Sequence, residues 1–201
     1  MITIVDYGMG NLGSIRNMLK RIDAPCCITG DLDSIAKAKK LILPGVGAFD
    51  AAVTQINDTG MREILDRKVI ENRVPILGIC LGMQILTLGS DEGELPGLGW
   101  ISAQTKRFPV QPDLKVPHMG WNIVYPSNTS RLTEEFEKET RFYFGHSYAV
   151  FADKAENSIL KTKYGVVFDS AIQRDNIYGV QFHPEKSHRF GMQILKNFAS
   201  L

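Results

Sequence analysis

The sequence predicts an α/β fold, an open and mostly parallel sheet with helices on both faces. Over residues 2–88, short apolar segments rich in β-branched residues alternate with segments of helical periodicity. These strand-like segments are almost continuously apolar, which is typical of parallel strands buried on both faces. The 201 residues can form one core, and no linker-like stretch divides them. We therefore expect a single domain over residues 1–201.

The first half of the chain supplies most of the expected alternation. Residues 2–5 (I-T-I-V) predict a strand that ends in a glycine-interrupted turn. Asn11 can then cap a helix whose apolar residues recur every three or four positions. Further strands are expected at residues 26–29, 40–43 and 75–79, and helices at residues 31–38, 48–57, 60–70 and 81–88.

The second half, from about Pro96, has shorter β-like segments separated by turns. We expect these segments at residues 123–125, 142–144, 148–151, 165–172 and 178–182. A closing helix is predicted over residues 189–198, where apolar residues again follow helical spacing.

Composition and charge exclude several function classes. Lys and Arg total 23 against 22 Asp and Glu, so a formal charge of +1 offers no field that would attract nucleic acid or an anionic membrane. The start of the chain has no signal-peptide pattern, and we expect a cytoplasmic protein. The three cysteines match neither a zinc motif nor a disulfide framework. We expect no metal and no organic cofactor.

Cys80 is the candidate nucleophile. It is the centre of Gly78-Ile79-Cys80-Leu81-Gly82, a G-x-C-x-G motif between a predicted strand and a predicted helix. This is the thiol form of the nucleophile elbow, in which a sharp turn exposes the central side chain and the small neighbours avoid collisions. The start of the following helix favours the thiolate. A buried packing cysteine is the alternative, but it needs neither the paired glycines nor the strand.

A cysteine nucleophile needs a base that a third group orients. His183 and Glu185 are two residues apart in a predicted extended segment, so their side chains point the same way and the carboxylate can fix the imidazole tautomer. A surface histidine followed by a solvated glutamate is the alternative. The other histidines are weaker candidates because none has a carboxylate two residues away, namely His118, His146 and His188.

An acyl-transfer site also needs donors for the oxyanion. The backbone N–H of Leu81, just after the nucleophile, is one candidate. The other is Val46, because the flanking glycines of residues 44–47 (P-G-V-G) would let its peptide swing towards the site. An ordinary Pro-Gly turn is the alternative for this segment.

These motifs resemble those of class I, triad-type glutamine amidotransferases. The resemblance rests on G-I-C-L-G-M-Q, G-V-Q-F-H-P-E-K-S and L-P-G-V-G-A-F, and it spans nearly the whole chain. Residues 6–12 (D-Y-G-M-G-N-L) and 116–122 (V-P-H-M-G-W-N) are similar to the glutaminase subunits of imidazole glycerol phosphate synthase. The resemblance implies the fold predicted above, with a nucleophile elbow.

The resemblance also implies roles. Cys80 would attack the side-chain amide of L-glutamine, His183 would transfer protons and Glu185 would orient the histidine. Residues that would hold the substrate are Gly47, Gln84, His146, Ser147 and Tyr148.

The partner implied by the resemblance is a (β/α)8 cyclase, joined to this chain as a heterodimer. Ammonia would pass through the barrel to a ribonucleotide-derived intermediate, giving imidazole glycerol phosphate and an aminoimidazole carboxamide ribotide for histidine biosynthesis. Partner-facing positions by the same analogy are Asn11, Trp121 and Tyr143, although Trp121 could equally be a core residue.

Some features depart from this pattern. Gly145 stands where a larger apolar residue is expected, which would loosen the substrate pocket. Residues 87–100 and the ending E-K-S-H-R-F-G-M resemble paralogues that feed ammonia to a sugar-amidating synthetase in surface-polysaccharide biosynthesis. A stand-alone cysteine hydrolase and a non-catalytic interaction subunit are further alternatives.

Overall fold

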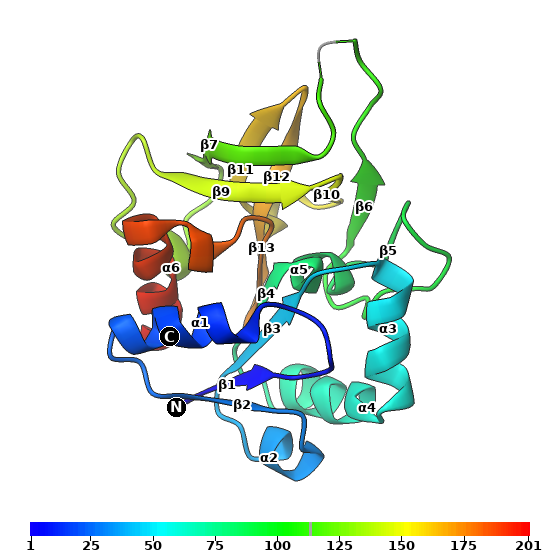
Figure 1. The fold of residues 1–201 in the computed structure, drawn as a ribbon, viewed down its shortest axis with the longest axis vertical. Coiled ribbons are helices and arrows are strands. Elements are labelled where there is room, and N and C mark those ends of the chain that lie inside the picture. Colours follow the sequence, from blue (N-terminus) through cyan, green and yellow to red (C-terminus); the bar gives the residue numbers. More distant parts are fainter. Residues whose placement is uncertain (113) are drawn as a thin grey trace.

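A computed structural model describes residues 1–112 and 114–201, and its centre is an eleven-stranded mixed sheet (Figure 1). Five strands of the sheet are parallel, in the order β2 (Cys26–Thr29), β1 (Ile2–Val5), β3 (Leu41–Gly45), β4 (Ile76–Cys80) and β13 (Ile177–Val180). The predicted fold class, an open and mostly parallel sheet between helices, is confirmed. The parallel strands place their carboxyl ends at one edge, where ligands bind in open α/β sheets.

The remaining strands extend the sheet beyond β13, mostly in antiparallel pairs. They are β12 (Val166–Arg174), β10 (Tyr148–Ala152), β6 (Ala103–Arg107) and β5 (Gly89–Ser90), with β11 (Ser158–Tyr164) and β8 (Tyr125–Pro126) branching from β12. A separate two-stranded ribbon joins β7 (His118–Ile123) to β9 (Arg141–His146). In Figure 1 this ribbon lies above the parallel strands, beyond the end of β13.

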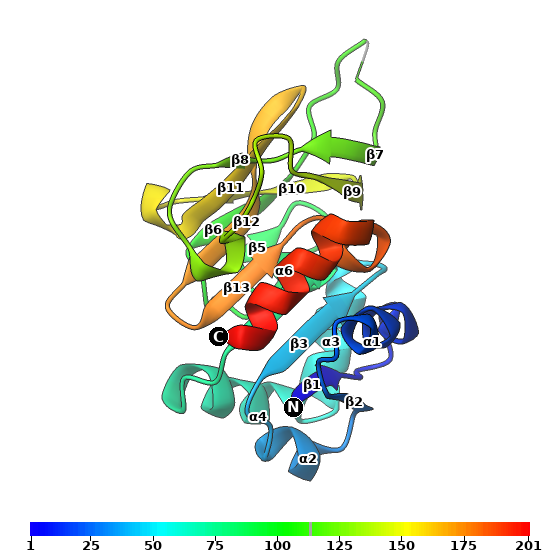
Figure 2. The same ribbon diagram turned by 90° about the vertical axis from the view of Figure 1, so that its left-hand side faces the viewer.

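Helices cover both faces of the parallel strands (Figure 2). On one face, α1 (Leu12–Arg21) and α6 (His188–Ser200) pack together, and their apolar residues join one core cluster. On the other face, α2 (Leu32–Ala36), α3 (Phe49–Asp58) and α4 (Met61–Asp66) bury a second cluster. Helix α5 (Leu81–Ile85) follows β4 directly. Short helical turns occur at Arg67–Glu71, Arg131–Thr133, Ala155–Asn157 and Pro184–Lys186.

The predicted element boundaries need several corrections. The helix expected over 81–88 ends at Ile85, because the chain turns at Thr87, whose hydroxyl donates to the Gln84 carbonyl at 2.7 Å, before entering β5. The helix expected over 60–70 begins at Met61 and changes to a π-helical turn after Asp66. The strand expected at 123–125 is divided between two strands, since β7 ends at Ile123 and β8 begins at Tyr125. Strands β6 and β11 were not predicted.

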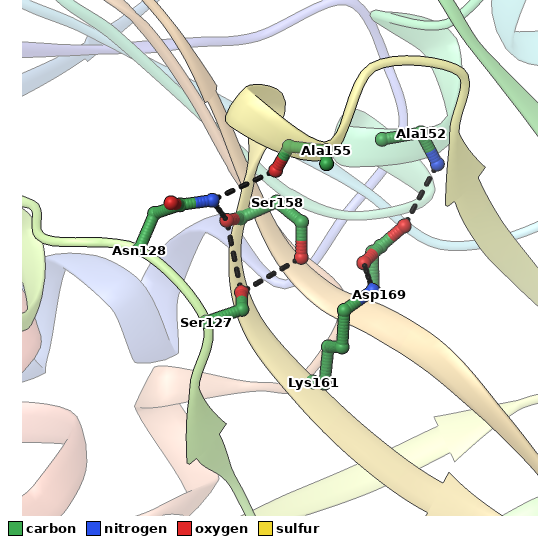
Figure 3. Close-up of polar contacts among 7 residues, drawn as sticks. All are labelled: Ser127, Asn128, Ala152, Ala155, Ser158, Lys161 and Asp169. Carbon is green, nitrogen blue, oxygen red and sulfur yellow. Dashed lines mark hydrogen bonds and ion pairs between the residues drawn. The ribbon is translucent and has the colours of Figure 1, made fainter.

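A buried carboxylate holds the antiparallel part of the sheet together (Figure 3). Asp169 on β12 accepts hydrogen bonds from the Ala152 backbone N–H and from Lys161 Nζ, both at 2.7 Å. Nearby, Ser127 Oγ lies 2.8 Å from Ser158 Oγ. These contacts join β10, β11 and β12 and fix the antiparallel half of the sheet beside β13. Across the described ranges, no helix is long and apolar enough to cross a membrane.

Candidate active site

A cavity of about 300 Å³ lies where β3, β4 and β13 reach the carboxyl edge of the sheet. The three strands are neighbours and parallel, so the residues that follow them meet although they are far apart in the sequence. The cavity lining includes Val46 and Gly47 after β3, Cys80 at the end of β4 and His183 after β13. The remaining lining residues are Leu81, Gln84, Glu92, Pro117, Met119, Gly145, His146, Ser147 and Tyr148.

Cys80 sits on a strained turn between β4 and α5. Its φ of 54° and ψ of −110° lie outside the regions that non-glycine residues ordinarily adopt. The flanking glycines make the turn possible for steric reasons. A Cβ on Gly82 would lie 1.9 Å from the Leu43 carbonyl oxygen, and a Cβ on Gly78 would lie 2.7 Å from the Gly82 oxygen. The predicted elbow is confirmed, and it presents the thiol to the cavity at the start of α5.

His183 and Glu185 form a buried pair next to this thiol. The distance from His183 Nδ1 to Glu185 Oε1 is 2.8 Å, and the two side chains are 7% and 2% exposed. Burial alone would lower the pKa of His183, but hydrogen bonds to Cys80 and Glu185, with the charges of both groups, outweigh burial and raise the pKa. The geometry therefore favours the protonated form of His183, which lies between Cys80 and Glu185.

The backbone around His183 is held independently of the pair. The His183 N–H donates to the Tyr143 carbonyl at 2.9 Å, and Ser187 Oγ donates to the His183 carbonyl at 2.6 Å. The same Ser187 hydroxyl accepts from the Tyr143 N–H at 3.0 Å. Strand β9 and the start of α6 thereby fix the imidazole against the elbow.

The segment 44–47 lies across the cavity from His183. Gly47 has a φ of +122°, which favours glycine, and the Val46 side chain is 53% exposed. Tyr7 Oη donates to the Pro44 carbonyl at 2.6 Å, so the end of β3 is anchored just before Val46. Burial and the nearby Cys80 charge raise the pKa of Tyr7, which keeps this phenol a donor. A hydrogen bond thus anchors the segment at Pro44, whereas the Val46 side chain is about half exposed.

Sequence reasoning missed three residues of the cavity, namely Glu92, Pro117 and Met119, and Glu92 is the charged one. Glu92 lies at the cavity mouth, and its Oε2 accepts a hydrogen bond from the Phe49 N–H at the start of α3 at 3.2 Å. Partial burial raises the pKa of Glu92. Among the described residues that line the cavity, Glu92 alone carries a carboxylate. The acidic cluster at 91–94 contained the signal, but nothing in the sequence placed it opposite the elbow.

The chemistry of these groups is that of a thiol hydrolase, and a family model decides between hydrolase families. The model described as glutamine amidotransferase class-I matches residues 3–200. The chain belongs to the class I glutamine amidotransferase family.

Relatives in this family cover the whole chain. The chain is 51% identical to imidazole glycerol phosphate synthase subunit HisH 2 of Methanococcus maripaludis, and the match covers 98% of each protein. It is 47% identical to the protein of the same name from Pseudomonas aeruginosa, over the full length of both. A crystal structure of a glutamine amidotransferase, 16% identical, superposes with a TM-score of 0.73 and covers 100% of this chain and 99% of that one. The match to this crystal structure shows only that the two folds are alike.

The three partner-facing candidates of this amidotransferase do not form one cluster of contacts. Trp121 and Tyr143 pair across the β7–β9 ribbon, with ring centroids 6.3 Å apart. Trp121 is 44% exposed and stacks on His188, which makes the core alternative for Trp121 wrong. Asn11 is exposed at the start of α1, where its side chain accepts from the Ser14 N–H at 3.4 Å.

Position 145 has the extra space that the sequence indicated. A Cβ built on Gly145 would lie 3.9 Å from His183 Nε2, an ordinary contact distance. A small side chain would therefore fit at this position, directly beside His183 Nε2.

Two further buried histidines predict acid sensitivity. Burial lowers the pKa of His118 to about 4, and burial, as the largest cause, lowers that of His146 to about 3. The unfolded chain binds these protons near pH 6.5, so between that pH and the folded values the unfolded state binds more protons and stability falls as pH falls. His183 acts in the opposite direction, because its raised folded-state pKa makes the folded state bind more protons, and this contribution fades below pH 6.5 as the unfolded histidine also becomes protonated.

The measurement is the free energy of unfolding in urea between about pH 6.5 and pH 5, above the range where most carboxylates titrate. We expect a loss of about 1 kcal/mol per pH unit for each neutral histidine. His118→Phe should show a shallower loss than the wild type. An equal slope in both proteins would contradict the assignment of His118 as a buried neutral group.

Proposed function

We propose that this chain is the glutaminase subunit of an imidazole glycerol phosphate synthase, which hydrolyses L-glutamine to L-glutamate and ammonia. The observation that carries the proposal is that Cys80 and His183 line one cavity, with Glu185 hydrogen-bonded behind His183, in a chain that belongs to the class I amidotransferases. Full-length relatives that are 47% and 51% identical and carry the synthase subunit name support the pathway.

In the first half of the reaction, the Cys80 thiolate attacks the amide carbon of the glutamine side chain. The oxygen of the tetrahedral intermediate takes the negative charge, and the backbone N–H groups of Leu81 and Val46 are the proposed donors. His183 gives its Nε2 proton to the leaving nitrogen, and ammonia departs as the thioester forms. Glu185 accepts from Nδ1 throughout and stabilises the imidazolium.

In the second half, neutral His183 takes a proton from water, and the resulting hydroxide attacks the thioester carbon. The bond to sulfur breaks, glutamate leaves, and the thiolate and imidazolium are restored. Water is the only reactant besides glutamine that these steps need. The buried Glu185 carboxylate keeps the same Nδ1 tautomer in both halves, so Nε2 faces the reacting atoms each time.

The amino-acid end of glutamine needs its own contacts. Gly47 and residues 146–148 lie on the cavity wall and are the proposed sites for that end of the substrate. Gln84 lines the same wall, with its amide nitrogen already bonded to the Tyr148 carbonyl. Glu92 is the proposed partner of the substrate α-ammonium group, because a carboxylate is the natural counter-ion there.

The role of Glu92 gives a specific prediction. Glu92→Gln removes the negative charge while keeping the side-chain length. We expect KM for glutamine to rise about tenfold or more, since a charge-assisted hydrogen bond to the α-ammonium is lost, and kcat to change less. Steady-state glutamate release measures both constants. Glu94→Gln on the same loop is the matched control, and a fall in kcat at constant KM would contradict this role.

Ammonia is largely protonated in water at neutral pH, so a subunit that makes it as a nucleophile should deliver it directly to an acceptor enzyme. We propose a (β/α)8 cyclase as the heterodimer partner, which would turn the ammonia and a ribonucleotide-derived intermediate into imidazole glycerol phosphate and an aminoimidazole carboxamide ribotide. The ribbon residues Trp121 and Tyr143, with Asn11, are the proposed partner-facing positions.

Co-purification of the tagged chain, followed by a glutamate-release assay, tests the proposal. A phosphate-binding barrel that raises glutamate release from a low basal rate is the expected result. An adenylating synthetase in its place would assign the chain to sugar amidation instead. Hydrolysis of esters or peptides without a partner would indicate a stand-alone hydrolase, and no release with any partner while the fold is intact would overturn the glutaminase.

A further inference from the structure

A continuous series of hydrogen bonds runs from the β7–β9 ribbon to the candidate nucleophile. At the ribbon end, Asn122 Nδ2 lies 3.2 Å from His118 Nε2, and His118 Nδ1 lies 3.0 Å from His146 Nε2. His146 Nδ1 then lies 2.7 Å from the Tyr148 carbonyl oxygen. Residues of three strands, β7, β9 and β10, are therefore connected through side chains.

The second part of the series reaches the sulfur. Gln84 Nε2 donates to the Tyr148 carbonyl and to Gln181 Oε1, both at 3.1 Å. Gln181 Nε2 in turn donates to Cys80 Sγ at 3.7 Å, within the range of a hydrogen bond to sulfur. Gln181 is fully buried, and Gln84 is 4% exposed.

The direction of every bond follows from the Tyr148 carbonyl in the middle of the series, which accepts from His146 on one side and from Gln84 on the other. A carbonyl oxygen only accepts, so His146 carries its proton on Nδ1 and its Nε2 accepts. His118 must then donate from Nδ1 and accept at Nε2 from the Asn122 amide, whose other N–H goes to the Lys163 carbonyl at 3.1 Å. Both imidazoles are neutral, as their burial requires.

The same argument fixes the two glutamine amides. Gln84 uses its nitrogen for two acceptors, so its Oε1 is left as the acceptor for the cavity that Gln84 lines. Gln181 accepts from Gln84 with its oxygen, so its N–H₂ group must face Cys80. Rotating the Gln181 amide would place two N–H₂ groups against each other and an oxygen against the sulfur. The series therefore holds a donor, and not an acceptor, on the nucleophile.

Packing alone does not require these polar residues. The His118 ring is stacked between Phe144 and Tyr164, with centroids 4.6 and 3.9 Å away and interplanar angles of 21°. A phenylalanine would fill this aromatic stack without the desolvation cost of an imidazole. Buried polar groups in such a setting are stable only when they are hydrogen-bonded, and both ring nitrogens of His118 and of His146 have a partner.

We propose that Gln181 and His118 are positioning residues for Cys80: the hydrogen-bond series holds the Gln181 N–H on the thiolate and makes that contact depend on the β7–β9 ribbon. The inference rests on the proposed function, in which Cys80 is the nucleophile. It adds a donor to the thiolate at the active site and a physical route by which the ribbon affects it.

The two faces of β7 explain how the ribbon would act. Met119 and Trp121 point outward and are 66% and 44% exposed, whereas His118 and Asn122 on the alternate positions point into the series. A partner that binds Met119 and Trp121 and displaces β7 also moves His118, because these residues belong to one strand. A shift of His118 changes its bond to His146. His146 shares the Tyr148 carbonyl with Gln84, and Gln84 orients Gln181.

Reactivity of the Cys80 thiol tests the inference without substrate or partner. The full chain is treated with chloroacetamide over a range of pH, and mass spectrometry follows the Cys80 peptide separately from those of Cys26 and Cys27. The variants are Gln181→Met and His118→Phe, with Gln173→Met on β12 and His188→Phe on α6 as controls for the same substitutions. Asn122→Leu is a second variant at the ribbon end in case His118→Phe fails to fold.

We expect Gln181→Met to lower the alkylation rate of Cys80 near neutral pH about tenfold and to move the pH–rate profile to higher pH by about one unit, since a hydrogen bond to a charged sulfur is lost. His118→Phe or Asn122→Leu should move the profile in the same direction by a smaller amount. The controls should leave it unchanged.

An unchanged profile in folded Gln181→Met would overturn the inference, and so would a shift in Gln181→Met with none in either ribbon-end variant. Neither result would affect the glutaminase proposal, which is judged separately by glutamate release from the wild-type chain with its partner. Conversely, a wild-type chain whose Cys80 is readily alkylated but which never releases glutamate would overturn the glutaminase proposal. The positioning roles of Gln181 and His118 would still stand.

Discussion

Cys80→Ala should abolish glutamine-dependent product formation by the complex while synthesis from added ammonium salts continues. The substitution removes the only atom that the proposed mechanism uses to form the thioester, so we expect glutamate release to fall at least about a thousandfold. The elbow itself should fold normally, and alanine should be no more strained than cysteine at a φ of 54°. Parallel assays with glutamine and with ammonium chloride as nitrogen donor measure the two activities.

Cys27→Ala is the matched control for this substitution. Cys27 is a half-buried thiol on β2, at the far end of the parallel strand order from β13, and its loss should leave both activities unchanged. If Cys80→Ala eliminated the ammonium-driven reaction as well, the separation of the glutaminase site from the acceptor site would be wrong.

Much of the site was predictable because its residues lie within short sequence motifs. The elbow is specified by two glycines around one cysteine, and the structure gives each glycine a steric reason, a Cβ at Gly82 being only 1.9 Å from a backbone oxygen. The predicted His183–Glu185 contact is present at 2.8 Å, but the extended backbone expected for it is wrong, since Pro184–Lys186 forms a 3-10 turn. What brings these motifs together is the parallel order β3, β4 and β13. Alternating strands and helices indicated a parallel sheet, but not this order.

Contacts between distant segments were not predictable in the same way. Glu92 reaches the cavity because the loop after α5 folds back onto the start of α3, where Phe49 donates to it. Gln181 looks like an ordinary strand residue until β13 is placed beside β4, which carries Cys80. Strands β6 and β11 were missed because apolar and polar residues are mixed along them.

The strain at Cys80 and the hydrogen bonds around it have a common consequence. The backbone at this residue is held in a sparsely populated conformation by Gly78 and Gly82, so the sulfur has little freedom to adapt to its neighbours. The neighbours must instead be placed around the sulfur. His183 is fixed through β9 and Ser187, and Gln181 is fixed through Gln84 on α5.

His183→Ala should be more damaging than Glu185→Gln, although both side chains are buried in the same pair. Without the imidazole no group protonates the leaving nitrogen or deprotonates water, and we expect kcat for glutamate release to fall at least about a thousandfold. A glutamine at 185 still accepts from His183 Nδ1 across the present 2.8 Å contact and keeps the tautomer, but it no longer offsets the imidazolium charge. The fall in kcat for Glu185→Gln should be at least about tenfold smaller than the fall for His183→Ala.

The measurement is kcat for glutamate release by the complex, with ammonium-driven synthesis as the control that the partner remains active. Because the Glu185 carboxylate helps to raise the pKa of His183, Glu185→Gln should also lower the pH above which the protonated imidazole is lost. The alkaline limb of the pH–rate profile should therefore move to lower pH in this variant. The opposite ranking of the two substitutions, or an unmoved alkaline limb in Glu185→Gln, would mean that the carboxylate does not act through the histidine.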